Sequence, residues 1–293
     1  MTPISTVDLH LHTFYSDGRF SPEEVLRHAA NVGLKTIALT DHDNANGARH
    51  AVDLARQLGM ELIPAIEFTS RLPGCDTSPE KGDIDILGYF LALDNPEFRA
   101  FEQAALNDIH IRVGECCDSL TSMGYPITRE EVFAENPRYA GVLHLVHAVQ
   151  KKGCAQDWNS AQRLVDSRWL PVRLSPFTTA QVIEQIHLAG GVAVLAHPAA
   201  IRCNGEWLQA RQLGRLVQAG LDGLEIYHPR LDQKARTYFL KLARQFELLV
   251  SGGSDSHGWG VGLNRTGSQP VRPEMVEALR ARHEVLQSII RSE

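Results

Sequence analysis

The feature that most constrains this sequence is a repeated alternation of short apolar runs with segments of helical periodicity. The strand-like runs cover residues 5–11, 35–39, 61–68, 83–89, 192–196, 223–227 and 248–251. Helical patterns lie between or after them at 21–31, 46–58, 179–188, 207–219 and 234–245. Strands that alternate with helices in this way predict an α/β fold with parallel strands and helices packed outside.

The alternation is interrupted near Pro96. Between residues 96 and 170 the sequence shows mostly helical periodicity, with amphipathic stretches at 109–123 and 143–152. No convincing buried strand occurs there, and the alternation of strands and helices returns afterwards. We therefore expect a β/α barrel built from residues 1–95 and 171–293, with a helical insert at 96–170 that forms a lid.

Composition limits the functional classes. The chain has 293 residues, 43% of them hydrophobic and 22% charged, with a formal net charge of −6. An acidic balance argues against a dedicated nucleic-acid coat protein, although bound cations could still attract a small nucleotide. No apolar run is long enough for a membrane span, and no signal peptide is evident. Five irregularly spaced cysteines exclude a complete disulfide framework, so we expect a cytoplasmic protein.

Histidines and carboxylates lie at or just after the ends of the predicted strands. In a β/α barrel the active site is built at the C-terminal ends of the strands, so residues from different strands come together there. The candidates found in this way are His10, His12, Asp41, His42, Glu67, Asp85, His197, His228, Asp255 and His257.

The pattern of these residues favours a metal site. His10 and His12 lie two apart on a strand and point to the same side, where two imidazoles beside an acid can hold a cation. Such a pair alone is a weak signal, and each further residue has an ordinary explanation, such as a solvated glutamate or a turn. If all the ordinary explanations held, unrelated histidines and carboxylates would have to lie by chance at five strand ends on one face. A shared metal site is therefore the favoured explanation.

The types of ligand indicate the chemistry. Mixed imidazole and carboxylate ligands suit Mn, Fe or Zn. A carboxylate such as Glu67 can bridge two ions, which share a water, lower its pKa and present hydroxide for in-line attack at phosphorus. The same ions supply positive charge to the phosphate oxygens.

The motifs HLHTFYSDG, ALTDHD, IPAIEF, VLAHP and SGGSDSH, in this order, resemble those of the PHP (polymerase and histidinol phosphatase) family. The resemblance covers roughly residues 6–95 and 175–265. It implies a distorted seven-stranded β/α barrel that carries two or three divalent ions, with Mn expected first and Fe, Zn or Mg as alternatives. Within the family, the chain is similar to bacterial phosphoesterases with a helical insert.

The resemblance also implies a set of ligands. The first sub-site would consist of His10, His12, Glu67 and Asp255. The second would consist of Glu67, Asp85 and His197, and the third of Asp17, His42 and His257.

One of these ligands departs from the family pattern. The family usually has histidine where this chain has Asp85, and a carboxylate there would make the second sub-site harder and more anionic, better suited to Mn or Mg. The other reading is a weak or empty second site. Asp41 and Asp43 are expected to orient their neighbours rather than bind metal.

Substrate contacts are less well defined. By resemblance His144 faces a substrate phosphate, but the arginine that often precedes it is absent, and His144 could equally be an ordinary residue near a helix start. Arginines are suitable replacements because guanidinium binds phosphate bidentately. The candidate catalytic residues are His228, Asp255 and His144. The candidate substrate-binding residues are His144, His228, Arg138, Arg202, Arg230 and Tyr139, of which Tyr139 could stack on a base.

The leading hypothesis is a metal-dependent phosphomonoesterase that removes the 3′-phosphate of nucleoside 3′,5′-bisphosphates, converting adenosine 3′,5′-bisphosphate to AMP. One alternative is a 5′-to-3′ exonuclease on short 5′-phosphorylated RNA or oligonucleotides. Histidinol phosphate is a lower-ranked substrate. A hypothesis from another class is a non-catalytic metal-binding module, but such modules typically lose ligands, and here nearly every position is filled.

Overall fold

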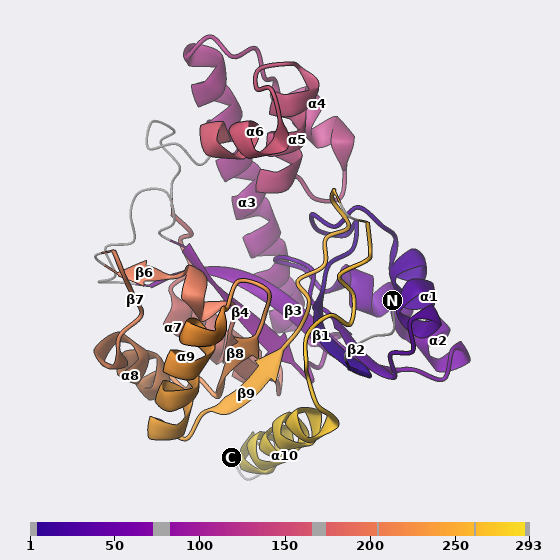
Figure 1. Cartoon of the computed structure of the whole chain (residues 1–293), viewed down its shortest axis with the longest axis vertical. Coiled ribbons are helices and arrows are strands. Elements are labelled where there is room, and N and C mark those ends of the chain that lie inside the picture. The colour runs from indigo at the N-terminus through magenta and orange to yellow at the C-terminus, as the bar shows by residue number, and fades with distance from the viewer. Residues whose placement is uncertain (1–4, 73–82, 166–173, 204, 261, 291–293) are drawn as a thin grey trace.

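The structure is a computed structural model that describes residues 5–72, 83–165, 174–203, 205–260 and 262–290 (Figure 1). The strands of the main sheet are β1 (Val7–Leu11), β2 (Thr36–Leu39), β3 (Glu61–Arg71), β4 (Asp83–Tyr89), β5 (Val192–Leu195), β8 (Gly223–Tyr227) and β9 (Leu249–Gly252). The helices are α1 (Pro22–Asn31), α2 (Asn46–Gln57), α3 (Pro96–Ser122), α4 (Arg129–Glu135), α5 (Val142–Lys151), α6 (Trp158–Val165), α7 (Thr179–Leu188), α8 (Ala210–Gln218), α9 (Gln233–Gln245) and α10 (Pro273–Ile290), with a short 3-10 turn η1 (Pro198–Ala200).

The main sheet has the order β1-β2-β3-β4-β5-β8-β9. All seven strand positions agree with the sequence, but the expectation that all strands are parallel is wrong for β4. That strand runs antiparallel to both of its neighbours, β3 and β5, whereas the other pairs are parallel. A parallel neighbour requires a crossover of about a dozen residues or more, usually helical, and the sequence has no helical pattern between β3 and β4.

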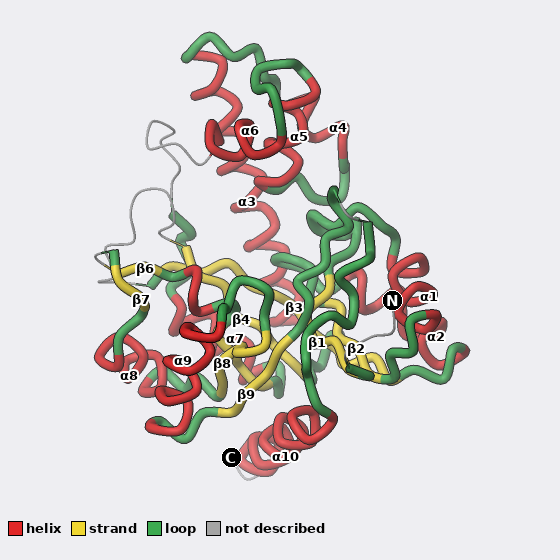
Figure 2. The backbone as a smooth tube through the Cα atoms, viewed as in Figure 1, coloured by secondary structure: helices red, strands yellow, loops and turns green. Residues whose placement is uncertain are grey.

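The sheet curls until its two outer strands meet beyond their C-terminal ends. The backbone N–H of His12 donates to the carbonyl of Ser256 (3.2 Å), and the N–H of Asp255 donates to the carbonyl of His10 (2.9 Å). Gly253 permits this approach, because a Cβ atom there would lie 2.3 Å from the Cβ of His10. The curled sheet in Figures 1 and 2 is therefore a strongly distorted seven-stranded half-barrel, which confirms the predicted α/β fold class.

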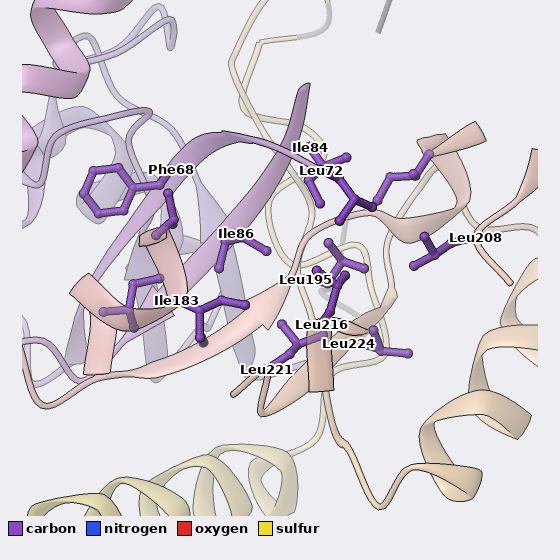
Figure 3. Packing of buried hydrophobic residues seen from close by; sticks show 14 of the residues in the cluster. Phe68, Leu72, Ile84, Ile86, Ile183, Leu195, Leu208, Leu216, Leu221 and Leu224 are labelled. Carbon is purple, nitrogen blue, oxygen red and sulfur yellow. The ribbon is translucent and has the colours of Figure 1, made fainter. Parts of the chain in front are cut away.

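Apolar side chains fill both faces of the sheet. On one face Phe68, Ile86 and Leu195 belong to a cluster that also includes Ile183 of α7 and Leu216 of α8 (Figure 3). On the other face, α10 contributes to a second cluster formed with β1, β2, β3 and β5. Each fully buried aliphatic or aromatic side chain contributes roughly 1.5–3 kcal/mol, so these two layers hold the strand ends in fixed positions.

The insert has its own core, formed by α4, α5, α6 and the second half of α3. The first half of α3 belongs to the barrel instead, because Phe98 and Ala105 pack in the sheet cluster while Ile109 and Leu120 pack in the insert. The change of packing therefore lies within α3, and the boundary of the insert at residue 96 stays a prediction. The predicted boundary at 170/171 lies outside the described residues.

Charged pairs fix α3 against the barrel. Glu102 accepts hydrogen bonds from the backbone N–H of Ala45 (2.6 Å) and from Arg49 (2.5 Å to Nη2). Further along the helix, Arg112 contacts Asp83 of β4 and Asp108, the latter at 2.9 Å. All of these groups are largely shielded from water, so α3 is held rigidly at the point where it leaves the barrel (Figure 2).

Several other elements differ from the sequence-based expectation. The segment predicted as a helix from residue 207 begins with the hairpin β6 (Arg202–Cys203) and β7 (Glu206–Trp207), and α8 starts at Ala210. The helix predicted from residue 109 is the second half of α3, and α10 was not anticipated.

The helices and the cysteines bear on the predicted environment of the protein. Within the described residues, every helix is too short or too polar to span a bilayer. Cys116, Cys117 and Cys154 are free thiols, whereas Cys203 is disulfide-bonded. That bond does not fit the reducing compartment expected from the cysteine count, and cytoplasmic localisation stays a prediction.

Candidate metal centre

The predicted ligands come together at one end of the half-barrel. His10 of β1, His12 directly after β1 and Glu67 of β3 point into the same buried space. His197 follows β5, and Asp255 follows β9, so both occupy the connections that leave this end of the sheet. The sequence-predicted convergence of strand ends therefore occurs in the folded chain.

Glu67 lies at the middle of the cluster and is fully buried. Its Oε2 atom is 3.0 Å from His10 Nε2, 3.2 Å from His12 Nε2 and 3.5 Å from His42 Nε2. Its Oε1 atom is 3.0 Å from His197 Nε2. A carboxylate whose two oxygens face different histidines has the geometry required of a ligand that bridges two ions.

The residues of the first implied sub-site face one another closely. The Nε2 atoms of His10 and His12 are 3.1 Å apart. Asp255 Oδ1 lies 3.5 Å from the first of these nitrogens and 3.3 Å from the second. Two imidazole nitrogens and two carboxylates, all turned to one point in the core, form a donor set of the kind that binds a divalent cation.

The third implied sub-site is formed by Asp17, His42 and His257. Asp17 Oδ1 is 3.1 Å from His257 Nε2, and its Oδ2 is 3.9 Å from His42 Nε2. His12 also belongs to this group, because its Nδ1 lies 3.7 Å from Asp17 Oδ1. His12 therefore contacts the first group through one ring nitrogen and the third through the other.

The second implied sub-site includes the unusual carboxylate. Asp85 Oδ2 lies 3.7 Å from His197 Nε2. Asp85 also forms a possible metal-binding group with His42 and Glu67, whose ligand atoms lie within 4.8 Å of one another. The structure thus places Asp85 beside the other candidate ligands, as the sequence predicted, and its role as a ligand stays a proposal.

Glu225 is a member of the site that the sequence did not reveal. It lies on β8 and is fully buried. Its Oε1 accepts a hydrogen bond from His10 Nδ1 at 2.8 Å, and its Oε2 accepts one from the backbone N–H of His197 at 2.8 Å. Because Nδ1 of His10 donates to this carboxylate, Nε2 presents its lone pair to the first sub-site. The available signal was a single glutamate inside the otherwise apolar strand GLEIY.

Burial and charge oppose each other in the cluster. Burial acts to raise the pKa of Glu67 and of Asp255, but the surrounding histidines hold both values well below their usual range. Burial acts to lower the pKa of His42, yet Glu67 and Asp17 raise it to about 10. The pKa of His10 is raised in the same way, by Glu67, Glu225 and Asp255.

This balance shows that the residues fit the metal ions that the fold family implies. Without cations, the buried carboxylates are stabilised only by protonating imidazoles that otherwise have free lone pairs. A divalent cation supplies that charge and leaves the imidazoles neutral, which is their ligating form.

Three non-glycine residues at this end of the barrel have a left-handed backbone. The φ angles are 57° at Asp43, 28° at His197 and 51° at Asp255. Such conformations cost of order 1–3 kcal/mol each and persist only where the surroundings impose them. All three residues follow strand ends, so the strain is stored where the chain must turn sharply to present a ligand or its neighbour.

A set of buried aspartates holds the ligand loops. Asp41 accepts hydrogen bonds from the backbone N–H of Thr13 and from Ser16 Oγ, both at 2.7 Å, and it thereby fixes the loop that carries Asp17. Asp43 accepts from the N–H of Thr69 at 2.9 Å. Both contacts agree with the predicted orienting role of these two acids.

His228 is buried beside Asp255. Its Nδ1 accepts the backbone N–H of Arg230 (3.0 Å), so Nε2 carries the proton and donates it to Asp255 Oδ2 (3.1 Å). Burial lowers the pKa of His228, which favours this neutral tautomer. The arrangement suits an orienting contact to Asp255. If His228 acted catalytically by giving this proton to a leaving oxygen, the hydrogen bond to Asp255 would have to break.

A pocket of about 430 Å³ opens above the cluster. Its floor includes Asp17, Asp85 and Asp255, and Arg230 lies at its wall. Helices α5 and α6 of the insert contribute Val142, Leu143, Trp158 and Gln162 to the same wall. The insert therefore lines one side of the pocket above the candidate metal centre, and its role as a lid stays a prediction.

Four predicted substrate residues lie elsewhere. Tyr139 is buried in the core of the insert, which corrects its assignment as a base-stacking residue. His144 is also buried, and its Nδ1 accepts the N–H of Gly141 (3.2 Å), so it caps α5 and does not line the pocket. The guanidinium of Arg138 lies 4.8 Å from the ring centroid of Phe14.

The fourth of these residues is Arg202, whose guanidinium lies 5.4 Å from the ring centroid of Trp207. Neither Arg138 nor Arg202 lines the described pocket, so Arg230 is the one predicted arginine that does.

Taken together, the curled α/β half-barrel and its buried histidine–carboxylate cluster define a metal-dependent hydrolase. The PHP domain family matches residues 8–228 of the chain, and the chain belongs to this family. It is a metal-dependent phosphoesterase, and the cluster is consistent with a centre of more than one ion.

Known proteins share most of the chain's length. A 5′-3′ exoribonuclease from Haemophilus influenzae is 29% identical over 86% of this chain and 91% of its own length. A 3′,5′-nucleoside bisphosphate phosphatase from Chromobacterium violaceum is 25% identical over 88% and 90%. The solved structure of a Bifidobacterium adolescentis protein, described as a metal-dependent phosphoesterase, superposes with a TM-score of 0.83 at 26% identity, covering 96% of this chain and 98% of that one.

Proposed function

We propose that the protein is a 5′-to-3′ exonuclease that removes mononucleotides from short 5′-phosphorylated RNA. The observation that carries the phosphoesterase chemistry is Glu67, whose two oxygens lie 3.0 Å from His10 Nε2 and from His197 Nε2. The similarity to the Haemophilus influenzae exoribonuclease, which spans most of both chains, supports the choice of substrate. The sequence ranked this activity second, behind a bisphosphate phosphatase.

The ligand assignment proposed for the ions follows the three groups described above. In this proposal His10, His12, Glu67 and Asp255 would hold the first ion, Glu67, Asp85 and His197 would hold the second, and Asp17, His42 and His257 would hold the third. When bound, such ions activate water as a nucleophile and stabilise negative charge on phosphate oxygens, with Mn as the metal we expect.

The remaining groups hold the ligands and the substrate. Glu225 fixes the ring of His10, and His228 holds Asp255 through its Nε2 proton. Arg230 lies at the pocket wall, where its guanidinium can bind a phosphate oxygen bidentately. The insert helices limit the access of bulk water above the reacting phosphate.

The bond that breaks in this reaction is the one between phosphorus and the 3′ oxygen of the first nucleotide. The oxygen of water forms the new bond to phosphorus, and the 3′ oxygen leaves and takes up a proton. The products are a nucleoside 5′-monophosphate and a strand that is one nucleotide shorter and again carries a 5′-phosphate.

A second candidate is the 3′,5′-bisphosphate phosphatase activity that the sequence favoured first. Adenosine 3′,5′-bisphosphate presents the same phosphorus–3′ oxygen bond, with no second nucleotide on the phosphate. The 25% identical Chromobacterium violaceum relative supports this candidate over nearly the same length of chain. A non-catalytic metal-binding module is disfavoured because all nine predicted ligand positions lie together at one end of the barrel.

The test uses purified protein with Mn²⁺ and two substrates, a 5′-phosphorylated RNA hexamer and adenosine 3′,5′-bisphosphate. We expect a ladder of products that shortens from the 5′ end, with higher kcat/KM for the hexamer. Glu67→Gln serves as the inactive control, since it removes the bridging charge and keeps the shape of the side chain. Failure to shorten the hexamer would refute the exonuclease, and phosphate release from the bisphosphate alone would establish the second candidate.

A further inference from the structure

A second pocket adjoins the one above the candidate metal centre. It has a volume of about 930 Å³ and lies between the insert and the connection that follows β9. Trp158, Gln162, Trp259 and Arg265 line both pockets, so the two spaces share one wall. A ligand held at the metal centre can therefore continue into the second pocket without leaving the protein surface.

Two tryptophans form the shared wall. Trp158 begins α6 of the insert, and Trp259 belongs to the connection after β9, yet their ring centroids are 5.8 Å apart with an interplanar angle of 27°. Trp259 is fixed beside the metal centre, because its Nε1 donates a hydrogen bond to the carbonyl of Asp17 (2.6 Å). His147 of α5 extends the aromatic surface, with its ring 5.3 Å from that of Trp259.

The charge of the second pocket suits an anion. Arg19 and Arg265 line it and are exposed, and neither forms an ion pair with a carboxylate among the described residues. Glu135 is the acidic residue in the described lining, and it is already paired with Lys151 at 2.7 Å and with His147 at 3.1 Å. The cations are therefore available to a ligand phosphate, while the carboxylate is compensated.

We propose that this second pocket binds the second nucleotide of the RNA substrate, with its base on the indole wall of Trp158 and Trp259 and the phosphate on its 3′ side near Arg19 and Arg265. Aromatic rings beside a positive groove are the features by which proteins bind single strands without reading their sequence. This inference rests on the proposed exonuclease activity and assigns the site that sets its preference for strands over mononucleotides.

The chemistry of the two candidate substrates makes the site testable. The same phosphorus–3′ oxygen bond breaks in both, but only the RNA carries a nucleotide that reaches the second pocket. Contacts to the second nucleotide therefore contribute to hydrolysis of RNA and not to hydrolysis of adenosine 3′,5′-bisphosphate, so loss of the site should lower kcat/KM more for RNA than for the bisphosphate. The measured quantity is the ratio of the two kcat/KM values, RNA over bisphosphate.

The first experiment compares this ratio in wild-type protein and in Trp158→Ala, Trp158→Phe and Arg19→Ala variants. We expect the ratio to fall about tenfold in Trp158→Ala, the size of one lost base–aromatic stack, and to recover in Trp158→Phe. In Arg19→Ala, RNA binding should become less sensitive to salt, because one phosphate contact changes the slope of log affinity against log salt by about 0.7. A ratio unchanged in all three variants overturns the site and leaves the exonuclease activity standing.

The second experiment does not depend on catalysis. A 5′-phosphorylated dinucleotide is titrated into the protein in the presence of EDTA while tryptophan fluorescence is recorded. We expect quenching whose midpoint is unchanged in Trp207→Phe, whose ring lines neither pocket, and in Trp158→Phe, which keeps an aromatic ring. In Trp158→Ala the midpoint should shift to about tenfold higher dinucleotide concentration. An unshifted midpoint in Trp158→Ala, or the absence of quenching in wild-type protein, overturns the proposal even if neither substrate is hydrolysed.

Discussion

The replacement of Glu225 by glutamine tests how the candidate metal centre is held together. Glu225 accepts two hydrogen bonds at 2.8 Å, one from His10 Nδ1 and one from the backbone N–H of His197. A glutamine has the same shape but offers one oxygen and one NH₂ group. It can therefore accept one of these two bonds, and its NH₂ then faces the other donor.

The expected magnitude follows from that mismatch. One hydrogen bond to a charged group, worth about 1.5–3 kcal/mol, is lost and replaced by two opposed donors. If the amide NH₂ faces His10, it favours the tautomer whose proton sits on Nε2, where the lone pair must face the ion. Loss of such supporting carboxylates typically weakens metal affinity or activity about 10–100-fold, and we expect Glu225→Gln to fall in that range.

The assay is a calorimetric titration of metal-free protein with Mn²⁺, together with kcat for RNA hydrolysis at saturating Mn²⁺. Circular dichroism checks that the variant folds. Glu184→Gln on the exposed face of α7 is the matched control, because the same chemical change occurs there in contact with water. A Mn²⁺ affinity of folded Glu225→Gln within twofold of wild type would show that His10 needs no such support, and the reasoning would be wrong.

Three further predictions concern the rest of the molecule. Arg112→Ala leaves Asp83 and Asp108 without their buried cation and should lower the free energy of unfolding in urea by about 3 kcal/mol. Removal of metal with EDTA should lower Tm, because the ions bind the folded state and stabilise it. The lost stability is about 2.7 kcal/mol if the free metal concentration was a hundred times Kd before EDTA was added. An unchanged Tm would contradict the metal site. Burial raises the pKa of the Cys117 thiol to about 12 and that of Cys116 to about 11, so both should resist alkylation at pH 8 while the less buried Cys154 reacts, as counted by mass spectrometry.

Much of the metal centre could be predicted because strand geometry is local. Side chains two residues apart on a strand point to the same face of the sheet, and consecutive parallel strands of a β/α protein end at the same edge. His10, Glu67 and His197 meet for these reasons alone. The same logic failed for the direction of β4. An antiparallel strand begins at the edge where its neighbours end, and Asp85 reaches the site because it lies near the beginning of β4.

Other parts of the site depend on which segments pack together, and no local pattern records that. Glu225 joins the candidate site because β8 lies close enough to β1 for its carboxylate to reach His10. Leu143 lines the pocket whereas His144 does not, because successive helical positions differ by about 100° and the buried ring of His144 faces Trp259 instead. The pairing of Trp158 with Trp259 joins segments about a hundred residues apart in the sequence.

The position of α3 has a consequence for how proteins of this kind diversify. This helix has 27 residues and is therefore about 40 Å long, and its two halves are buried in two different cores. The candidate metal ligands all lie on the barrel, to which the first core belongs, whereas α4, α5 and α6 depend on the second core. Mutations that remodel those three helices can therefore alter which molecules are admitted without disturbing the reactive centre, so selectivity and reactivity can evolve as separate traits in one chain.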